Sequence, residues 1–221
     1  IQVINTGIII GGIYFFLNRI KINKLNKILP YHLFNRIFSL TKEYYPNNLT
    51  NLKKLFKLVF YEVFYLLKGY KQSSVTILNH HRFTDNIPCQ YYFLHKIVNF
   101  LKKNDIKILL DLGCGGGRSI YFFNKKLRIN YYGIEYQKRI FEGCKLFLNN
   151  FDNIKIYNYD FMSYKFLDLN ADCFFINDPL KKKDDFNRLI ENIINKNEKN
   201  KKTIYFILID VNENKREIFN K

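Results

Sequence analysis

Arginine is scarce in this basic sequence. The 221 residues include 36 Lys and Arg against 19 Asp and Glu, a formal net charge of +17, and only 8 of the basic residues are Arg. Proteins that recognise phosphates and bases favour the planar, bidentate guanidinium group. The lysines are also spread over the whole chain. We interpret the charge mainly as a solvated, lysine-rich exterior, with a functional basic surface for nucleic acid or anionic lipid as the alternative.

The sequence also lacks the close cysteine pairs of metal sites. Its four cysteines lie 25 to 30 residues apart, at Cys89, Cys114, Cys144 and Cys173. No CxxC pair or Cys/His cluster occurs, which argues against the common zinc sites. His80 and His81 are adjacent, and neighbouring side chains of a strand or helix point apart. The pattern predicts reduced thiols in an intracellular, cytoplasmic protein, and no metal site.

Charged side chains are missing from residues 1–18, and residues 7–17 are apolar throughout. The apolar run is shorter than the roughly 20 residues of a spanning helix. No positive charge precedes it, as one would in a signal peptide. Two interpretations stay open. The chain is a fragment that begins within a membrane helix, with its basic flank on an anionic cytoplasmic surface, or this segment is a buried helix at the domain edge.

Beyond this apolar segment of residues 1–20, the chain divides into two further regions. Residues 21–104 are expected to form a helical extension with a lid region, including a helix from Pro88 to about Leu101. From 105 onward, strand-like runs at 106–112, 130–134, 154–159, 171–176 and 203–209 alternate with helical stretches at 119–126, 137–148 and 184–194. This alternation predicts an α/β, three-layer sandwich with a mostly parallel sheet.

A glycine-rich turn follows the first of these strands. The segment runs Asp111-Leu112-Gly113-Cys114-Gly115-Gly116-Gly117 and leads into a helix. Glycines allow positive φ and close approach of a ligand to the backbone. The carboxyl end of the first strand is also where open α/β sheets bind their ligands. The turn is therefore predicted to be a ligand-binding loop.

Asp-x-Gly-x-Gly-x-Gly after an apolar strand resembles the first motif of the Rossmann-like (class I) methyltransferases that use S-adenosylmethionine (SAM). The resemblance covers about the second half of the chain. It implies that Gly113, Gly115 and Gly117 lie beside the methionine portion of SAM, with Asp111 ordering the loop and the amino group. A complete relative would add a final antiparallel hairpin after Lys221.

The nearest competitor is the dinucleotide fingerprint Gly-x-Gly-x-x-Gly of NAD(P)-dependent oxidoreductases. Read from Gly113, its third glycine falls on Arg118; read from Gly115, it falls on Ile120. Neither frame supplies the helix-packing glycine. The sequence therefore favours SAM over NAD.

Acids at the ends of the next two strands extend the predicted site. Glu135 follows the second strand, 24 residues after Asp111. The resemblance implies that Glu135 binds the ribose hydroxyls, that Asp160 accepts from the adenine amino group and that Phe161 covers the ring. A helix-capping role for Asp160 is the alternative.

The fourth strand ends in Asn177-Asp178-Pro179-Leu180. In amino-group methyltransferases the corresponding signature is Asn/Asp-Pro-Pro-aromatic, of which only Asp178-Pro179 is present. Asn177 and Asp178 are the candidate catalytic residues, facing the acceptor or SAM, with simple turn chemistry as the alternative. Upstream, Phe83, Thr84 and Asp85 are lid candidates.

The predicted function is transfer of the SAM methyl group to an unidentified acceptor, whether protein, RNA, lipid or small molecule. A NAD(P)-dependent oxidoreductase is one alternative. A non-catalytic, membrane-associated module with the same fold is another, supported if aromatics such as Phe122, Tyr136 or Phe161 block the pocket.

Overall fold

The computed structural model describes residues 49–70, 80–199 and 201–220. The predictions for residues 1–20 and for the basic stretch after them lie outside this range. Among the described residues, no helix combines the length and hydrophobicity needed to cross a membrane.

The chain forms two compact units, Ile1–Gln72 and Ser73–Lys221. The described part of the first is helix α4 (Leu49–Leu67), within the region predicted to be helical. The second unit contains the sheet and also residues 80–103, so the predicted lid region belongs to the same compact unit as the glycine turn.

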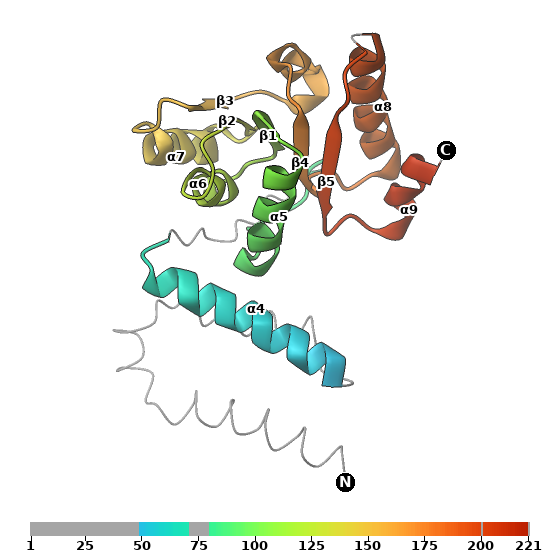
Figure 1. Cartoon of the computed structure of the whole chain (residues 1–221). Coiled ribbons are helices and arrows are strands. Elements are labelled where there is room, and N and C mark those ends of the chain that lie inside the picture. Colours follow the sequence, from blue (N-terminus) through green and yellow to red (C-terminus); the bar gives the residue numbers. More distant parts are fainter. Residues whose placement is uncertain (1–48, 71–79, 200, 221) are drawn as a thin grey trace. The chain divides into compact units, whose positions relative to one another are not determined.

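The sheet of the second unit has five parallel strands in the order β3-β2-β1-β4-β5 (Figure 1). They are β1 (Ile108–Leu112), β2 (Asn130–Ile134), β3 (Ile154–Tyr157), β4 (Cys173–Asn177) and β5 (Tyr205–Ile209). All five were predicted within two residues at each end. The strand order reverses at β1, which makes its carboxyl end the switch point where such sheets bind ligands. The predicted α/β fold is confirmed.

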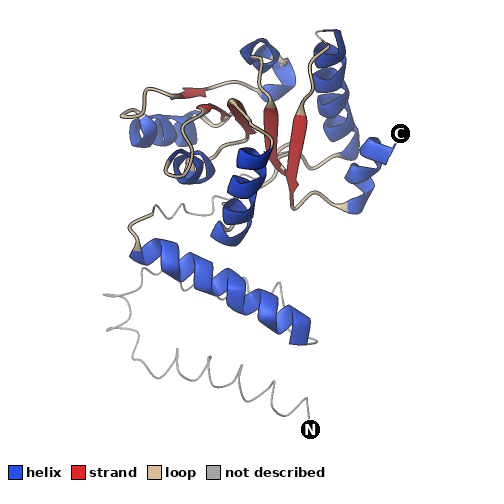
Figure 2. Ribbon diagram, in the orientation of Figure 1, coloured by secondary structure: helices blue, strands red, loops and turns tan. Residues whose placement is uncertain are grey.

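Helices cover both faces of this sheet (Figure 2). They are α5 (Tyr91–Lys103), α6 (Arg118–Asn124), α7 (Lys138–Leu148), α8 (Lys183–Lys199) and α9 (Glu213–Arg216), with 3-10 turns η1 (Phe161–Ser163), η2 (Lys165–Leu169) and η3 (Glu217–Asn220). The prediction that Pro88 lies in the first turn of α5 is wrong. The helix begins at Tyr91 after an extended Gln90, and Pro88 lies before the helix.

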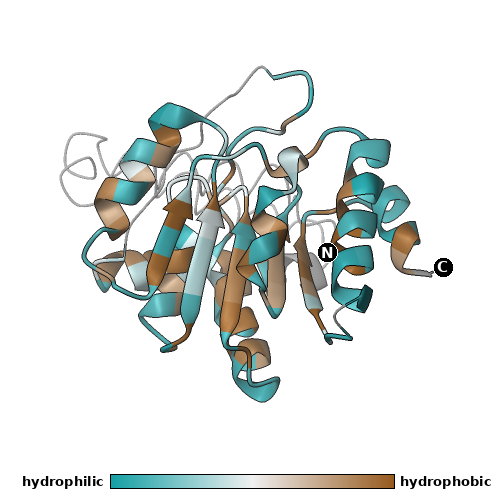
Figure 3. Ribbon diagram, turned by 90° about the horizontal axis from the view of Figure 1, so that it is seen from above, coloured by the Kyte–Doolittle hydropathy of each residue, from teal (hydrophilic) through white to brown (hydrophobic). Residues whose placement is uncertain are grey.

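Alternation along the strands separates two hydrophobic layers. Leu110 and Leu112 of β1 pack in the cluster that includes Phe186, Leu189, Ile190 and Ile193 of α8. The opposite face of the sheet carries Phe175, whose ring lies 5.8 Å from that of Phe123 in α6. Most strand residues in Figure 3 are hydrophobic, while the helices carry hydrophilic residues on part of their surface. Burial on both faces explains why β1 and β4 are nearly continuously apolar.

Candidate functional site

The glycine turn after β1 depends on glycine at three positions. Gly113, Gly115 and Gly117 have φ of 86°, 53° and 79°, a region that L side chains rarely adopt. The N–H groups of Gly113 and Cys114 both donate to the carbonyl of Ile134, at 2.9 and 3.0 Å. The turn is thereby fixed to the end of β2, next to Glu135.

The three predicted ligand-binding glycines face different surroundings. Gly113 lines the cavity described below and lies against Pro179, whereas a Cβ on Gly115 would collide with the carboxamide of Asn86. A Cβ on Gly117 would lie 2.7 Å from both Cys144 Sγ and Leu148 Cδ1 of α7. The structure thus places Gly117 against a helix, where glycine permits close packing.

Gly117→Ala is expected to lower the free energy of unfolding by more than 1 kcal/mol, because the methyl group meets α7 and the left-handed backbone disfavours alanine. Gly143→Ala is the control. It lies inside α7 with open space around it, and should raise stability by about 0.5–1 kcal/mol. Urea denaturation measures both. Equal effects of the two substitutions would contradict the packing role of Gly117.

Asp111 is a buried carboxylate at the end of β1, 2% exposed. Its Oδ2 atom has no hydrogen-bond partner. Burial, and then the nearby charge of Glu135, hold the pKa of Asp111 well above its ordinary value. A buried acceptor left without a donor is costly and uncommon in folded proteins. A donor or cation bound beside Asp111 would remove that cost.

Glu135 stands at the end of β2 and is 6% exposed. Its Oε2 accepts from Gly115 N at 3.0 Å and its Oε1 from Gln137 N at 2.8 Å. Burial raises the pKa of Glu135, and hydrogen bonds from the backbone N–H groups of Gln137, Gly115 and Tyr136 partly offset that rise. A carboxylate can accept about four hydrogen bonds. Glu135 also lines the larger of two cavities at this end of the sheet, which are described below. Its carboxylate therefore has capacity for hydroxyl donors of a ligand.

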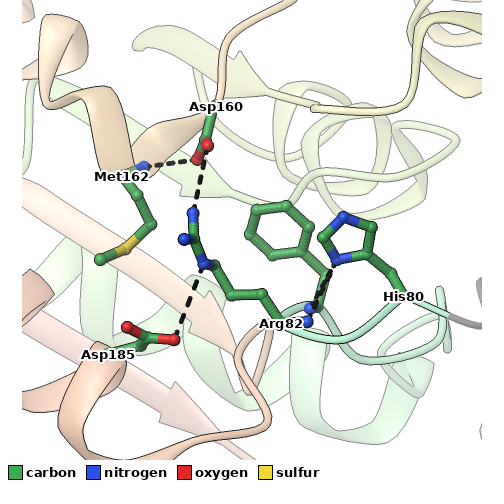
Figure 4. Close-up of polar contacts among 6 residues, drawn as sticks. His80, Arg82, Asp160, Met162 and Asp185 are labelled. Carbon is green, nitrogen blue, oxygen red and sulfur yellow. Dashed lines mark hydrogen bonds and ion pairs between the residues drawn. The ribbon is translucent and has the colours of Figure 1, made fainter.

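Asp160 has the capping role that was the alternative to adenine binding. Its Oδ1 accepts from Met162 N at 2.8 Å and caps η1. Its Oδ2 lies 3.4 Å from the guanidinium of Arg82, which also reaches Asp185 at 3.7 Å (Figure 4). Phe161 is buried and lines the larger cavity, as its predicted place beside a ligand requires. The adenine-binding roles of Asp160 and Phe161 stay predictions.

The two candidate catalytic residues lie at the end of β4. Asn177 lines both of the cavities described below. Its Nδ2 donates to Ile87 O at 2.8 Å, whereas its Oδ1 is buried and has no hydrogen-bond partner. Asp178 pairs instead with the buried ammonium of Lys215 at 2.6 Å. The structure therefore brings Asn177 into the site and gives Asp178 a structural contact that the sequence did not indicate. Their catalytic roles stay predictions.

Residues 80–88 lie across this end of the sheet, and we call them the strap. Phe83 forms an antiparallel bridge with Leu180. Backbone hydrogen bonds join Thr84 N to Pro179 O at 3.1 Å and Lys181 N to Arg82 O at 2.8 Å. Phe83, Thr84 and Asp85, the predicted lid residues, all line the larger cavity.

The strap also contains contacts that the sequence did not predict. Arg82 reaches Asp160 and Asn86 reaches Gly115, and the only sequence signal for either was its position next to the predicted lid residues. The expectation that His80 and His81 point apart is wrong. Their rings stack at 4.5 Å, because this segment is neither helix nor strand. His80 Nδ1 accepts from the N–H groups of Arg82 and Phe83 (Figure 4). Among the described residues, no cluster of three His, Cys, Asp or Glu has metal-site geometry.

Two small cavities remain between the strap and the strand ends. The larger, about 50 Å³, is lined by the strap, Gly113, Glu135, Tyr136, Phe161, Asn177 and Pro179. The smaller, about 20 Å³, lies among Asp111, Gly113, Arg118, Asn177 and others. Sites for drug-sized ligands have about 300–1,000 Å³. The two cavities between the strap and the strand ends are thus smaller than a typical site for such a ligand.

Comparison with known proteins gives similarity to solved structures only. No family model matches the sequence, and no curated protein matches it. The Podospora anserina methyltransferase PaMTH1, solved with S-adenosylhomocysteine (SAH) bound, is 15% identical with a TM-score of 0.43, over 50% of this chain and 49% of that protein. An RNA methyltransferase from Salinibacter ruber in complex with SAH is 15% identical with a TM-score of 0.42, over 50% of this chain and 71% of that one. The chain therefore spans about half the length of PaMTH1.

Proposed function

We propose that the chain binds SAM at the carboxyl ends of β1 and β2 and transfers its methyl group to an acceptor. The observation that carries this proposal is the buried Asp111 carboxylate, whose Oδ2 has no hydrogen-bond partner and which lines the smaller cavity beside the glycine turn. Asn177 contributes a second buried oxygen without a partner to the same cavity. Two unsatisfied acceptors suit an ammonium group, such as the amino group of an amino acid.

The charge of the site favours SAM over a dinucleotide. Asp111 and Glu135 are both buried acids, close enough for the charge of Glu135 to raise the pKa of Asp111. SAM carries a sulfonium and an ammonium, so it brings net positive charge to these acids. NAD would bring a diphosphate beside them, where like charges repel.

Each part of SAM would have a place among these residues. Asp111 and Asn177 would hold the amino group, Glu135 the ribose hydroxyls, and Phe161 with Tyr136 the base. When bound, SAM supplies the activated methyl group, and the protein's contribution is to orient the acceptor and exclude water. The acceptor stays open, since acceptor choice resides in loops and appendages.

A second candidate function is favoured by the small volume of the larger cavity. Phe83, Tyr136 and Phe161 fill the place where a base would bind, as in a module that keeps the fold without turnover. Two of the suspected blocking aromatics, Tyr136 and Phe161, line this cavity. The third, Phe122, instead packs on Tyr91 in the core.

Isothermal titration of the full chain with SAM, SAH and NAD tests the proposed function. SAM and SAH are expected to bind and NAD is not. Glu135→Gln keeps one acceptor for the glycine turn but removes the charge, and should weaken SAM binding by roughly 1.5–3 kcal/mol. Glu142→Gln, on α7 outside the cavity lining, should leave the affinity unchanged. NAD binding without SAM binding would overturn the proposal, and absence of both would favour the non-catalytic module.

A further inference from the structure

The strap contacts several of the residues that were predicted to bind SAM or face the acceptor. Arg82 pairs with Asp160, the ring of Phe83 packs on Phe161, and the backbone carbonyl of Ile87 accepts from Asn177. Contacts of this kind could arise in any lid that lies above a ligand. Two further details concern the space that the proposed SAM ligand would need.

The first detail is the position of Phe83. Its ring centroid lies 4.9 Å from that of Tyr136 and 5.2 Å from that of Phe161, and the residue is 5% exposed. Aromatic pairs at such distances are in packing contact. Tyr136 follows the acid of β2 and Phe161 follows the acid of β3, so an aromatic base of the ligand would enter between them. Phe83 already fills that slot.

The second detail is the position of Asn86. A Cβ placed on Gly115 would lie 2.9 Å from Asn86 Cγ, so the open side of this glycine is filled by the carboxamide. Glycine in such a turn allows close approach of a ligand to the backbone. Here the group that approaches is a polar side chain of the same protein.

The forces that hold the strap are of a kind that can be reversed. Its ion pairs involve Arg82, with about a third of its side chain exposed, and such pairs contribute little. Thr84 donates through N to Pro179 O and through Oγ1 to Asp178 O, bonds that water can replace when the strap leaves. Phe83 and Pro88 are the buried apolar residues of the strap, and the ring of Phe83, the larger of the two, makes the largest apolar contribution. Its removal should therefore shift the strap toward an open state.

We propose that the strap is an internal competitor for the SAM site: Phe83 occupies the base slot and Asn86 the space above Gly115, and both have to leave before SAM binds. This inference rests on the proposed function. If the strap competes in this way, the apparent affinity for SAM equals the intrinsic affinity multiplied by the fraction of molecules whose strap is open. Ligand and strap exclude one another, so the closed conformation holds the chain inactive until SAM displaces it.

The test is titration of the full chain with SAH, comparing wild type with Phe83→Ala. The variant is expected to bind roughly tenfold or more tightly, because a larger fraction of molecules is open. Phe100→Ala is the control, since Phe100 contacts Tyr205 rather than the strap and should leave the affinity unchanged. Weaker binding by Phe83→Ala would contradict the strap proposal and make Phe83 part of the binding site. Equal binding would also contradict it and show that Phe83 does not affect the ligand.

Hydrogen exchange of the wild-type chain gives a second measurement that needs no variant. The N–H groups of Thr84 and Lys181 are hydrogen-bonded only while the strap is closed. SAH is expected to accelerate their exchange, and a slower exchange in SAH would show a lid that closes over the ligand instead. If SAH binds and exchange slows, the strap proposal fails alone. If neither wild type nor Phe83→Ala binds SAH, the proposed function fails and the strap proposal with it.

Discussion

Replacement of Lys215 by methionine is expected to lower the free energy of unfolding by about 3 kcal/mol. The side chain of Lys215 is 3% exposed, and its Nζ donates to Asp178 Oδ1 at 2.6 Å and to Leu180 O at 2.5 Å. Removal of one partner from a buried ion pair costs about 3–5 kcal/mol, because the remaining charge is left without compensation. We expect the lower end, since the side chain of Asp178 is 20% exposed. Urea denaturation with a constant m-value is the measurement.

Lys183→Met is the matched control for Lys215→Met. Lys183 pairs with Glu217 at 2.6 Å, but the two side chains are 44% and 59% exposed. Exposed pairs contribute about 0–1 kcal/mol, so this variant should stay close to wild type. The double variant Lys215→Met/Asp178→Asn should recover part of the loss, because no unpaired charge remains. Equal stability of the two single lysine variants would contradict a structural role for Lys215.

The consequence of this ion pair extends to the candidate site. It fixes Asp178, Pro179 and Leu180, the turn that receives Thr84 and Phe83 of the strap. One lysine from α9, 37 residues beyond Asp178, therefore holds one wall of the cavity in place. This accounts for an Asp at position 178 without a catalytic role.

The sequence predicted the framework of the site because the framework depends on local patterns. The strand-like runs at 130–134 and 154–159 correspond to strands that the structure has at 130–134 and 154–157. The glycine turn was predicted at the end of β1, where three positive φ angles require it. Parallel pairing then brings the ends of β1 and β2 together, so that Glu135 had to lie near Gly115.

The strap could not be predicted because its contacts are not local. Arg82 meets Asp160 across 78 residues, and Thr84 meets Asp178 across 94. Neither hydrophobic periodicity nor a turn motif reports such pairs. The three lid candidates were chosen because their segment precedes the first strand. That position indicates that the segment lies near the glycine turn, but not how closely its side chains approach the turn. That Asn86 reaches Gly115 follows only from the path of the folded backbone.

Asp111→Asn is expected to raise the stability of the protein while weakening SAM binding. The substitution keeps the shape of the side chain and replaces a buried ionisable carboxyl, whose Oδ2 has no hydrogen-bond partner, by a neutral amide. Burial and the charge of Glu135 disfavour the ionised form of Asp111, so the variant should be the more stable protein at any pH where the wild-type carboxyl is ionised. Loss of the charged acceptor for an amino group should weaken SAM binding by roughly 1.5–3 kcal/mol.

The pH dependence of stability identifies Asp111 as the source. Its pKa is raised in the folded protein, so its contribution to stability is complete below about pH 4 and is lost as the pH rises through the folded pKa. Wild type and Asp111→Asn should therefore have similar stability at low pH and diverge as the pH rises. Denaturation at a series of pH values, with SAH titration at pH 7, provides both measurements.

Asp172→Asn is the control of opposite sign for Asp111→Asn. Burial opposes ionisation of Asp172, but hydrogen bonds from Lys202 and from the N–H groups of Ile108 and Lys107 outweigh it and lower its pKa. The stability it contributes is therefore present above about pH 4 and lost as the pH falls through the folded pKa. Asp172→Asn should destabilise the protein at pH 7 and leave SAM binding unchanged, because Asp172 stands at the opposite end of the sheet, where it anchors the start of β1. If Asp111→Asn also lowered stability, Asp111 would be a structural residue, and the main support for a ligand at this site would be lost.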